Sequence, residues 1–151
     1  MRAVLDSSFF FADYSAEGEL YTTSSVIDEI RDVASRCRLE RRLAEGLEVR
    51  IAQPHLRESV LSGASRTGDA SRLSPTDIDV LAVALELGAS VYTDDFSLEN
   101  VAHTLAVPVI SLRERMAQPI RWKFRCSGCG RYARIEGECP ICGAAVKRKR
   151  K

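Results

Sequence analysis

The chain has 151 residues, 45% of them hydrophobic and 28% charged, which is an ordinary composition for a soluble globular protein with one main domain. No apolar run approaches the roughly 18 residues that a membrane span requires. An aspartate at position 6 interrupts the first apolar stretch, so the plan of a secretion signal is missing. These features exclude a membrane protein and predict a cytoplasmic location.

The formal net charge of +1 hides an asymmetry along the chain. Residues 1–111 carry 10 Lys and Arg against 18 Asp and Glu, whereas residues 112–151 carry 12 against 3. Opposed halves of this kind indicate a basic surface for a polyanion beside a separate acidic body. The alternative is two solvated faces of unlike sign.

Strand and helix patterns alternate along the first 110 residues. Strands are predicted at 2–5, 19–22, 47–52, 90–93 and 107–110. Helices are predicted at 7–11, from the caps at 23–25 to about 31–34, and at 35–46, 54–64, 75–87 and 95–106, with 63–72 as loop or frayed helix. This alternation predicts an α/β fold, in which helices flank a parallel sheet on both faces.

Carboxylates stand where these elements end or begin. Asp6 follows the first strand, Glu29 lies on the helix after the second, Asp77 opens the helix at 75–87, and Asp94 and Asp95 follow the fourth strand. In open α/β sheets, ligands bind at the carboxyl ends of the strands. We therefore expect these side chains to share one edge of the sheet.

Helical spacing sorts the acids on the two helices. Glu29 falls on the border of the buried face of its helix, and Asp77 falls within the buried side of the later helix. Asp28 and Asp79 point away from those faces, so solvated charge is the better interpretation for both, and Asp79 is only a secondary candidate.

Each acid also has a purely structural explanation. Asp77 completes a Ser-x-x-Asp capping box, and Asp95 and Asp6 could each cap the helix that follows. Together, however, buried carboxylates would repel one another unless a cation neutralised them. Mg²⁺ or Mn²⁺ suits a set of oxygen ligands and could promote attack on a phosphodiester.

Four segments in this order resemble the PIN-domain nucleases. They are Asp6 after the first strand, and residues 25–30 (SVIDEI), 73–84 (LSPTDIDVLAVA) and 93–102 (TDDFSLENVA). The resemblance covers residues 1–110 and implies a metal-dependent endoribonuclease. It implies that Asp6, Glu29, Asp77 and Asp95 bind the Mg or Mn ion, with Asp94 as second choice for the last position. Asn100 is expected to anchor its helix or loop.

Four of the five cysteines form two pairs, Cys126-x₂-Cys129 and Cys139-x₂-Cys142, separated by nine residues. A glycine follows each pair and permits the tight turn that this spacing needs. Four thiolates so arranged predict a structural, tetrahedral zinc site. Disulfides are the alternative, and they do not fit a cytoplasmic chain.

Basic and aromatic residues interleave around the cysteines. The candidates for RNA binding are Arg121, Trp122, Lys123, Arg125, Arg131 and Arg134. Cations suit phosphates and aromatic faces suit bases. The alternative, that the aromatic residues only pack the ribbon, would leave binding through the arginines intact.

A PIN domain followed by a zinc ribbon resembles the Nin-one-binding ribosome-maturation endonucleases in their short archaeal form. The expected organisation is a PIN-like domain at 1–111, a linker at 112–121, a zinc ribbon at 122–146 and a disordered basic tail at 147–151. The resemblance implies cleavage of precursor small-subunit rRNA near its 3′ end, on or near the precursor particle. The alternatives are a toxin-type PIN ribonuclease acting on tRNA or mRNA, and a non-catalytic RNA-binding assembly factor.

Overall fold

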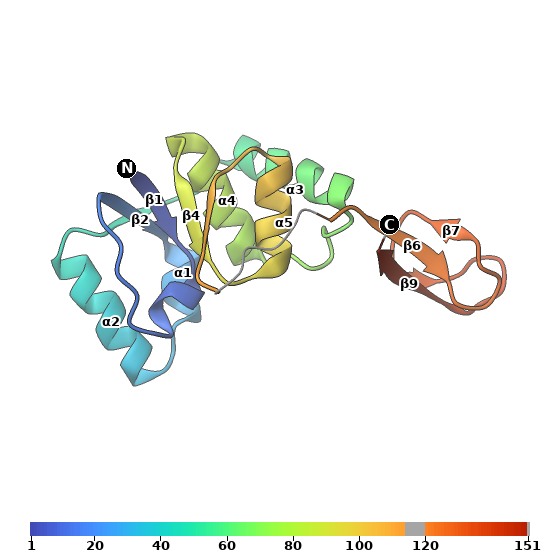
Figure 1. The fold of residues 1–151 in the computed structure, drawn as a ribbon, viewed down its shortest axis with the longest axis horizontal. Helices are drawn as coiled ribbons and strands as arrows, with labels where there is room; N and C mark the ends of the chain where they lie inside the picture. Colours follow the sequence, from blue (N-terminus) through green and yellow to red (C-terminus); the bar gives the residue numbers. More distant parts are fainter. Residues whose placement is uncertain (114–119, 151) are drawn as a thin grey trace.

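The computed structural model describes residues 1–113 and 120–150, which form a larger α/β body and a smaller β module (Figure 1). Residues 114–119 of the predicted linker lie outside the described residues. No helix in the described part is long and apolar enough to cross a bilayer. The β module extends from the end of the body where α3 and α5 lie, and α2 lies at the opposite end (Figure 1).

The body is built on a five-stranded sheet of order β3-β2-β1-β4-β5, in which all neighbours pair in parallel. Its strands are β1 (Arg2–Leu5), β2 (Glu19–Thr23), β3 (Glu48–Arg50), β4 (Ser90–Thr93) and β5 (Val109–Ser111). β1 is central, with Val4 paired to Tyr21 on one side and to Val91 on the other. The α/β class, with a parallel sheet flanked by helices, is confirmed.

The helices of the body surround this sheet. They are the 3₁₀ turn η1 (Ser7–Phe10), α1 (Ser24–Glu29), α2 (Val33–Ala44), α3 (Pro54–Thr67), α4 (Pro75–Leu87) and α5 (Phe96–Thr104). α4 is the central helix, because four consecutive residues, Val80 to Val83, have no exposed surface. Its start is fixed by a capping box, in which the Asp77 amide donates to Ser74 Oγ (3.1 Å) and the Ser74 amide donates to Asp77 Oδ2 (2.7 Å).

The region after α1 departs from the prediction. α1 ends at Glu29, because Ile30 adopts an extended backbone with φ −79° and ψ 106°, whereas the predicted helix ran to about 31–34. α2 then starts anew at Val33. Asp32 caps it by accepting a hydrogen bond from the Ser35 amide (2.8 Å). The Asp32 cap therefore places the boundary between the two predicted helices earlier in the chain than the predicted boundary between about 31–34 and 35.

The β module is a four-stranded antiparallel sheet of order β7-β6-β9-β8. Its strands are β6 (Trp122–Cys126), β7 (Tyr132–Ala133), β8 (Gly137–Glu138) and β9 (Ala145–Arg150). Its buried core consists of four residues, Phe124, Cys126, Cys139 and Val146. So small a core cannot hold a module together without a covalent or metal crosslink.

The prediction of a disordered basic tail at 147–151 is wrong for residues 147–150. Residues 147–150 continue β9, which pairs with the full length of β6 from Cys126↔Val146 to Trp122↔Arg150. Backbone hydrogen bonds form this ladder and need no particular side chains. The stems of long basic residues also cover apolar surface, and the guanidinium carbon of Arg148 lies 4.0 Å from the centre of the Trp122 ring. Lys151 lies outside the described residues.

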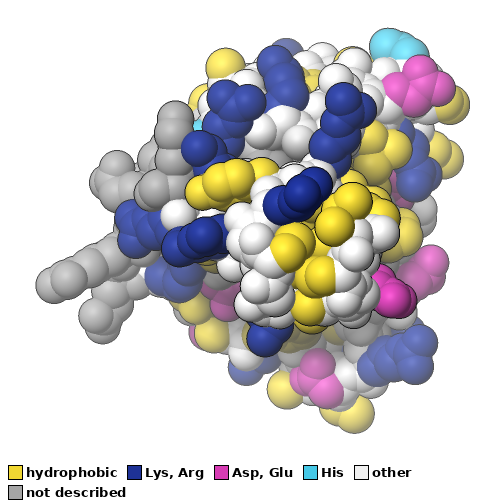
Figure 2. Space-filling view, turned by 90° about the vertical axis from the view of Figure 1, so that its right-hand side faces the viewer, with side chains coloured by type: hydrophobic (Ala, Val, Ile, Leu, Met, Phe, Trp, Pro, Cys, Tyr) yellow, Lys and Arg dark blue, Asp and Glu magenta, His cyan; other side chains and the backbone are white. Residues whose placement is uncertain are grey.

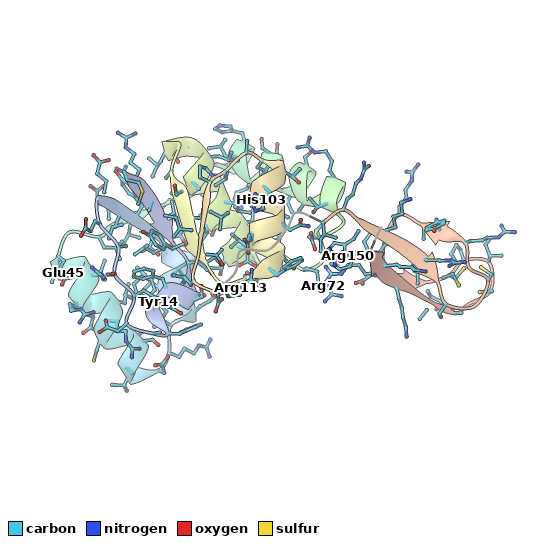
Figure 3. All side chains as sticks on the ribbon, in the orientation of Figure 1. Tyr14, Glu45, Arg72, His103, Arg113 and Arg150 are labelled. Carbon is cyan, nitrogen blue, oxygen red and sulfur yellow. The ribbon has the colours of Figure 1, made fainter. Side chains whose placement is uncertain are left out.

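A buried ion pair joins the two parts. Asp69, in the turn after α3, is fully buried, and Arg148 of β9 donates to its Oδ1 at 2.7 Å. Asn100 of α5 donates to the other carboxylate oxygen and also exchanges hydrogen bonds with the backbone of Ile120. Arg72 lies between the two parts (Figure 3) and pairs with Glu136 of the ribbon at 3.2 Å. Asn100 thus acts as the predicted anchor.

Candidate active site

Asp6 lies at the carboxyl end of the central strand, where it is 4% exposed. Its Oδ1 accepts a hydrogen bond from the Ser7 amide (2.7 Å), and its Oδ2 accepts from Ser8 Oγ (3.0 Å) and Thr93 Oγ1 (2.8 Å). Burial raises the pKa of the Asp6 carboxyl, these three hydrogen bonds partly offset that effect, and the Asp95 carboxylate raises the pKa further. The site therefore fixes the carboxylate while making its charge costly.

Asp77 is a second acid at this edge. Burial raises its pKa to about 6, the capping bonds with Ser74 lower it in part, and the charges of Asp6 and Asp95 raise it again. The charges of Asp6, Asp77 and Asp95 thus act on one another, although among the described residues no three acidic side chains lie close enough in this structure to share an ion. A divalent cation bound between these carboxylates would relieve their electrostatic repulsion.

Asp94 and Asp95 are both exposed after β4, but they differ in their surroundings. Asp95 Oδ1 caps α5 by accepting from the Leu98 amide (3.0 Å), and its charge acts on both Asp6 and Asp77. Asp94 donates its amide to Ser8 Oγ (3.2 Å). Of the two, the Asp95 carboxylate has the electrostatic link to the other acids.

The remaining acid candidates, Glu29 and Asp79, have different surroundings. Glu29 is exposed at the end of α1, and no hydrogen bond or ion pair holds its side chain among the described residues. Asp79 was expected to be solvated, yet its side chain is only 18% exposed, because Arg57 pairs with it at 3.1 Å and Ser25 Oγ donates to it at 2.8 Å. Asp79 thus ties α1 and α3 to α4, which is a structural use of the charge.

The sequence reading missed two hydroxyl groups that orient Asp6. Thr93 Oγ1 donates to Asp6 and accepts from the Asp95 amide (3.0 Å), so it connects two of the acids. Ser8 Oγ donates to Asp6 and accepts from the Asp94 amide. Their positions in the sequence could have indicated this role, because Thr93 directly precedes the acid pair and Ser8 lies two residues after Asp6.

We expect the substitution Asp77→Asn to stabilise the metal-free protein at neutral pH. A folded-state pKa of about 6 against an ordinary value of 3.8 means that the unfolded chain loses this proton first, so stability falls as pH rises from about 4 to 6. Removing the charge should recover about 2 kcal/mol of unfolding free energy at pH 7.5, and Asn Oδ1 can still accept from the Ser74 amide. Urea unfolding at pH 7.5 and 4.5, without divalent ions, measures the difference.

The control for this measurement is Asp28→Asn, which removes an exposed charge from α1. Its unfolding free energy should match that of the parent at both pH values. A gain for Asp77→Asn that persists undiminished at pH 4.5 would contradict the role of its ionisation.

The four paired cysteines converge on one point, with their sulfurs all within 4.8 Å of one another. Among the described residues this is the group whose ligand atoms are close enough to share an ion. Burial raises the pKa of the Cys126 thiol, but hydrogen bonds from the amides of Cys129 and Gly128 and from the thiols of Cys142 and Cys129 together outweigh this effect and bring the pKa to about 6. Thiolate ligands at this spacing fit zinc, so the predicted ribbon is confirmed as a fold.

The six predicted RNA-binding residues all lie on or beside the ribbon sheet. Five of them are exposed: Arg121, Lys123, Arg125, Arg131 and Arg134. Trp122 is half-buried beneath Arg148. Arg125 is already used in part, because its Nε donates to the Gly130 carbonyl at 2.9 Å.

Known proteins resemble this chain over most of its length. The family described as the PIN domain of ribonuclease matches residues 3–87. The chain is 38% identical over 152 residues to endoribonuclease Nob1 of Pyrococcus abyssi, covering 97% of this chain and 92% of the relative. It is 39% identical over 136 residues to ribonuclease VapC1 of Thermoplasma acidophilum, covering 87% and 69%.

A third relative comes from a eukaryote. The chain is 39% identical over 86 residues to the 20S-pre-rRNA D-site endonuclease nob1 of Schizosaccharomyces pombe, covering 57% of this chain and 22% of that protein. The family match and the carboxylates at the strand ends define the body as a PIN nuclease domain. With its four-cysteine ribbon and its identity to archaeal relatives over nearly the whole chain, the protein belongs to the Nob1 family of endoribonucleases.

Proposed function

We propose that this endoribonuclease cleaves precursor small-subunit rRNA near its 3′ end during ribosome maturation in the cytoplasm. In this proposal residues 1–111 form the nuclease domain that cleaves the RNA, and residues 122–150 form a zinc ribbon that binds it. Residues 112–121 connect the two. The observation that carries the catalytic part is the mutual repulsion of three carboxylates at the ends of β1 and β4 and the start of α4. The rRNA substrate is supported by the similarity to the fission-yeast relative, which is a 20S-pre-rRNA D-site endonuclease by name.

In this proposal Asp6, Asp77 and Asp95 hold Mg²⁺ or Mn²⁺, with Glu29 reaching the same ion from α1 and Asp94 and Asp79 as weaker candidates. The bound ion would supply an activated water and neutralise charge on the leaving oxygen of the phosphodiester. Ser7, Ser8 and Thr93 keep the Asp6 carboxylate oriented before substrate arrives. The carboxylates would otherwise repel RNA phosphates, so the ion is also required for substrate approach.

Cleavage of three different RNA substrates tests the proposal. The experiment compares, with Mn²⁺ present, a short RNA spanning the 3′ end of the small-subunit rRNA, a tRNA and an unstructured mRNA fragment. Cutting at one site of the rRNA fragment, with the other two left whole, is the expected result. Preferential cutting of the tRNA or mRNA would favour a toxin-type ribonuclease instead. Tight binding of the rRNA fragment without cutting, also in the presence of the precursor particle, would favour an assembly factor.

A further inference from the structure

A groove of about 530 Å³ runs along the junction between the PIN body and the ribbon. One wall is the last turn of α3, and the other is formed by β6 and β7 with the residue before β6. The two walls touch at Gly68, where an added Cβ would come within 3.2 Å of both the Phe124 ring and Trp122. The groove therefore exists only because the ribbon docks against this turn.

Four cationic side chains line the groove. Arg66 comes from the body, and Arg121, Lys123 and Arg134 come from the ribbon side. All four are exposed, and within residues 1–113 and 120–150 none of them pairs with an acidic side chain. The neighbouring cations Arg72 and Arg148, which hold the two parts together, both have acidic partners. Cations without acidic partners in one groove form a site for a polyanion.

Aromatic rings complete the groove. The Trp122 ring is covered by Arg148, whereas Tyr132 on the same wall is 65% exposed. Lys123 Nζ lies 5.5 Å from the centre of the Tyr132 ring, so a cation and a flat apolar face stand side by side. This pairing suits a phosphate next to an unstacked base.

We propose that this groove binds a single-stranded RNA segment, with the PIN body and the ribbon each supplying one wall. Phosphates lie against Arg66, Arg121 and Arg134, and a base stacks on Tyr132. Since bases inside a duplex cannot reach an aromatic wall, single strands are the favoured ligand. The proposal rests on the proposed function only in taking RNA as the ligand, and it assigns to Arg66 a role in binding that the sequence did not indicate.

Beside this groove, the ion pair between Asp69 and Arg148 joins the body to the ribbon, and Asn100 of α5 donates to the same buried carboxylate.

The test measures the affinity of the full-length, zinc-loaded protein for a fluorescein-labelled 10-nucleotide oligouridine, without added Mg²⁺ or Mn²⁺. Fluorescence anisotropy compares the parent with Arg66→Ala, Arg66→Lys, Tyr132→Ala and the control Arg36→Ala. Arg36 is a matched control because it is an exposed helical arginine on α2, at the far end of the molecule (Figure 1). Figure 2, which looks at the ribbon end, shows Lys and Arg side chains across the upper part of that face.

We expect Arg66→Ala to weaken binding about 5- to 10-fold and to reduce the slope of log affinity against log salt by about 0.7. Arg66→Lys should restore most of the affinity, Tyr132→Ala should weaken binding at least about 5-fold, and Arg36→Ala should leave it unchanged. Equal affinities for Arg66→Ala and the parent, an equal loss for Arg36→Ala, or preference for a duplex of the same length would each overturn the proposal. This assay measures binding and not cleavage. Its result therefore does not depend on the outcome of the rRNA cleavage experiment.

Discussion

The substitution Asp6→Asn is expected to reduce RNA cleavage at least about 100-fold while leaving the fold and RNA affinity intact. Asp6 is the most buried of the three repelling carboxylates, and three hydrogen bonds fix it at the end of the central strand. An amide of the same shape loses one anionic oxygen, which lowers affinity for a divalent ion. The hydroxyls of Ser8 and Thr93 can rotate to accept from the new amide, so the side chain keeps hydrogen-bond partners.

Cleavage rates should be measured at several Mn²⁺ concentrations, together with the melting temperature in the absence of metal. The matched control is Asp28→Asn, which removes an exposed charge. Asp94→Asn and Asp95→Asn are compared with each other, and we expect the larger loss for Asp95→Asn, since the Asp95 charge raises the pKa of both Asp6 and Asp77. Asn also caps helices well, so the start of α5 is preserved. Full activity of Asp6→Asn would place the active site elsewhere.

Removal of zinc should unfold the ribbon and leave the PIN body folded. The ribbon buries four residues, and two of them, Cys126 and Cys139, are themselves proposed ligands. Zinc sites in such modules supply about 10–16 kcal/mol of apparent binding free energy, which is folding free energy. The body has its own large core around β1 and α4, so it does not depend on the metal. The substitution Cys126→Ser should act in the same way as a chelator.

Metal analysis should give one zinc per chain for the parent and almost none for Cys126→Ser, with Cys37→Ser as the control on exposed α2. Amide spectra should lose the ribbon signals and retain those of the body. Trp122 is the only tryptophan in the sequence and lies against Arg148. Its fluorescence therefore reports ribbon unfolding directly. A ribbon that keeps its signals after complete zinc removal would contradict this prediction.

Local signals explain which parts of the fold could be predicted from the sequence. The helix at 75–87 and the strand at 90–93 match the structure at both ends, because a capping box, a proline and a glycine mark their limits within a few residues. The boundary between the first two α-helices was predicted too late in the chain, because the apolar spacing continues across Ile30 and only the Asp32 cap marks the break. Periodicity alone cannot show whether a helix continues along an apolar spacing or ends before a capping residue.

In the candidate site too, local sequence signals indicated some residues, whereas residues that depend on distant partners were missed. The sequence pointed to Asp6, Asp77 and Asp95 through their places at strand and helix ends, and in the structure the charges of Asp6 and Asp95 raise the pKa of Asp77. It did not reveal Asp69, because a buried acid in a turn becomes meaningful only when its partner, Arg148, arrives from 79 residues away. The strand at 147–150 was missed for the same reason, since its pairing partner is β6 and its own composition is that of a solvated tail.

The hydrogen bond between Thr93 and Asp6 spans 87 positions of the chain, and it joins the two strands whose ends carry the acids. A nascent chain that has not yet reached β4 can form neither this bond nor the pairing of β1 with β4. Contacts of such high contact order form late in folding, because the intervening loop must close first. The proposed catalytic site can therefore be complete only after β4 has been synthesised.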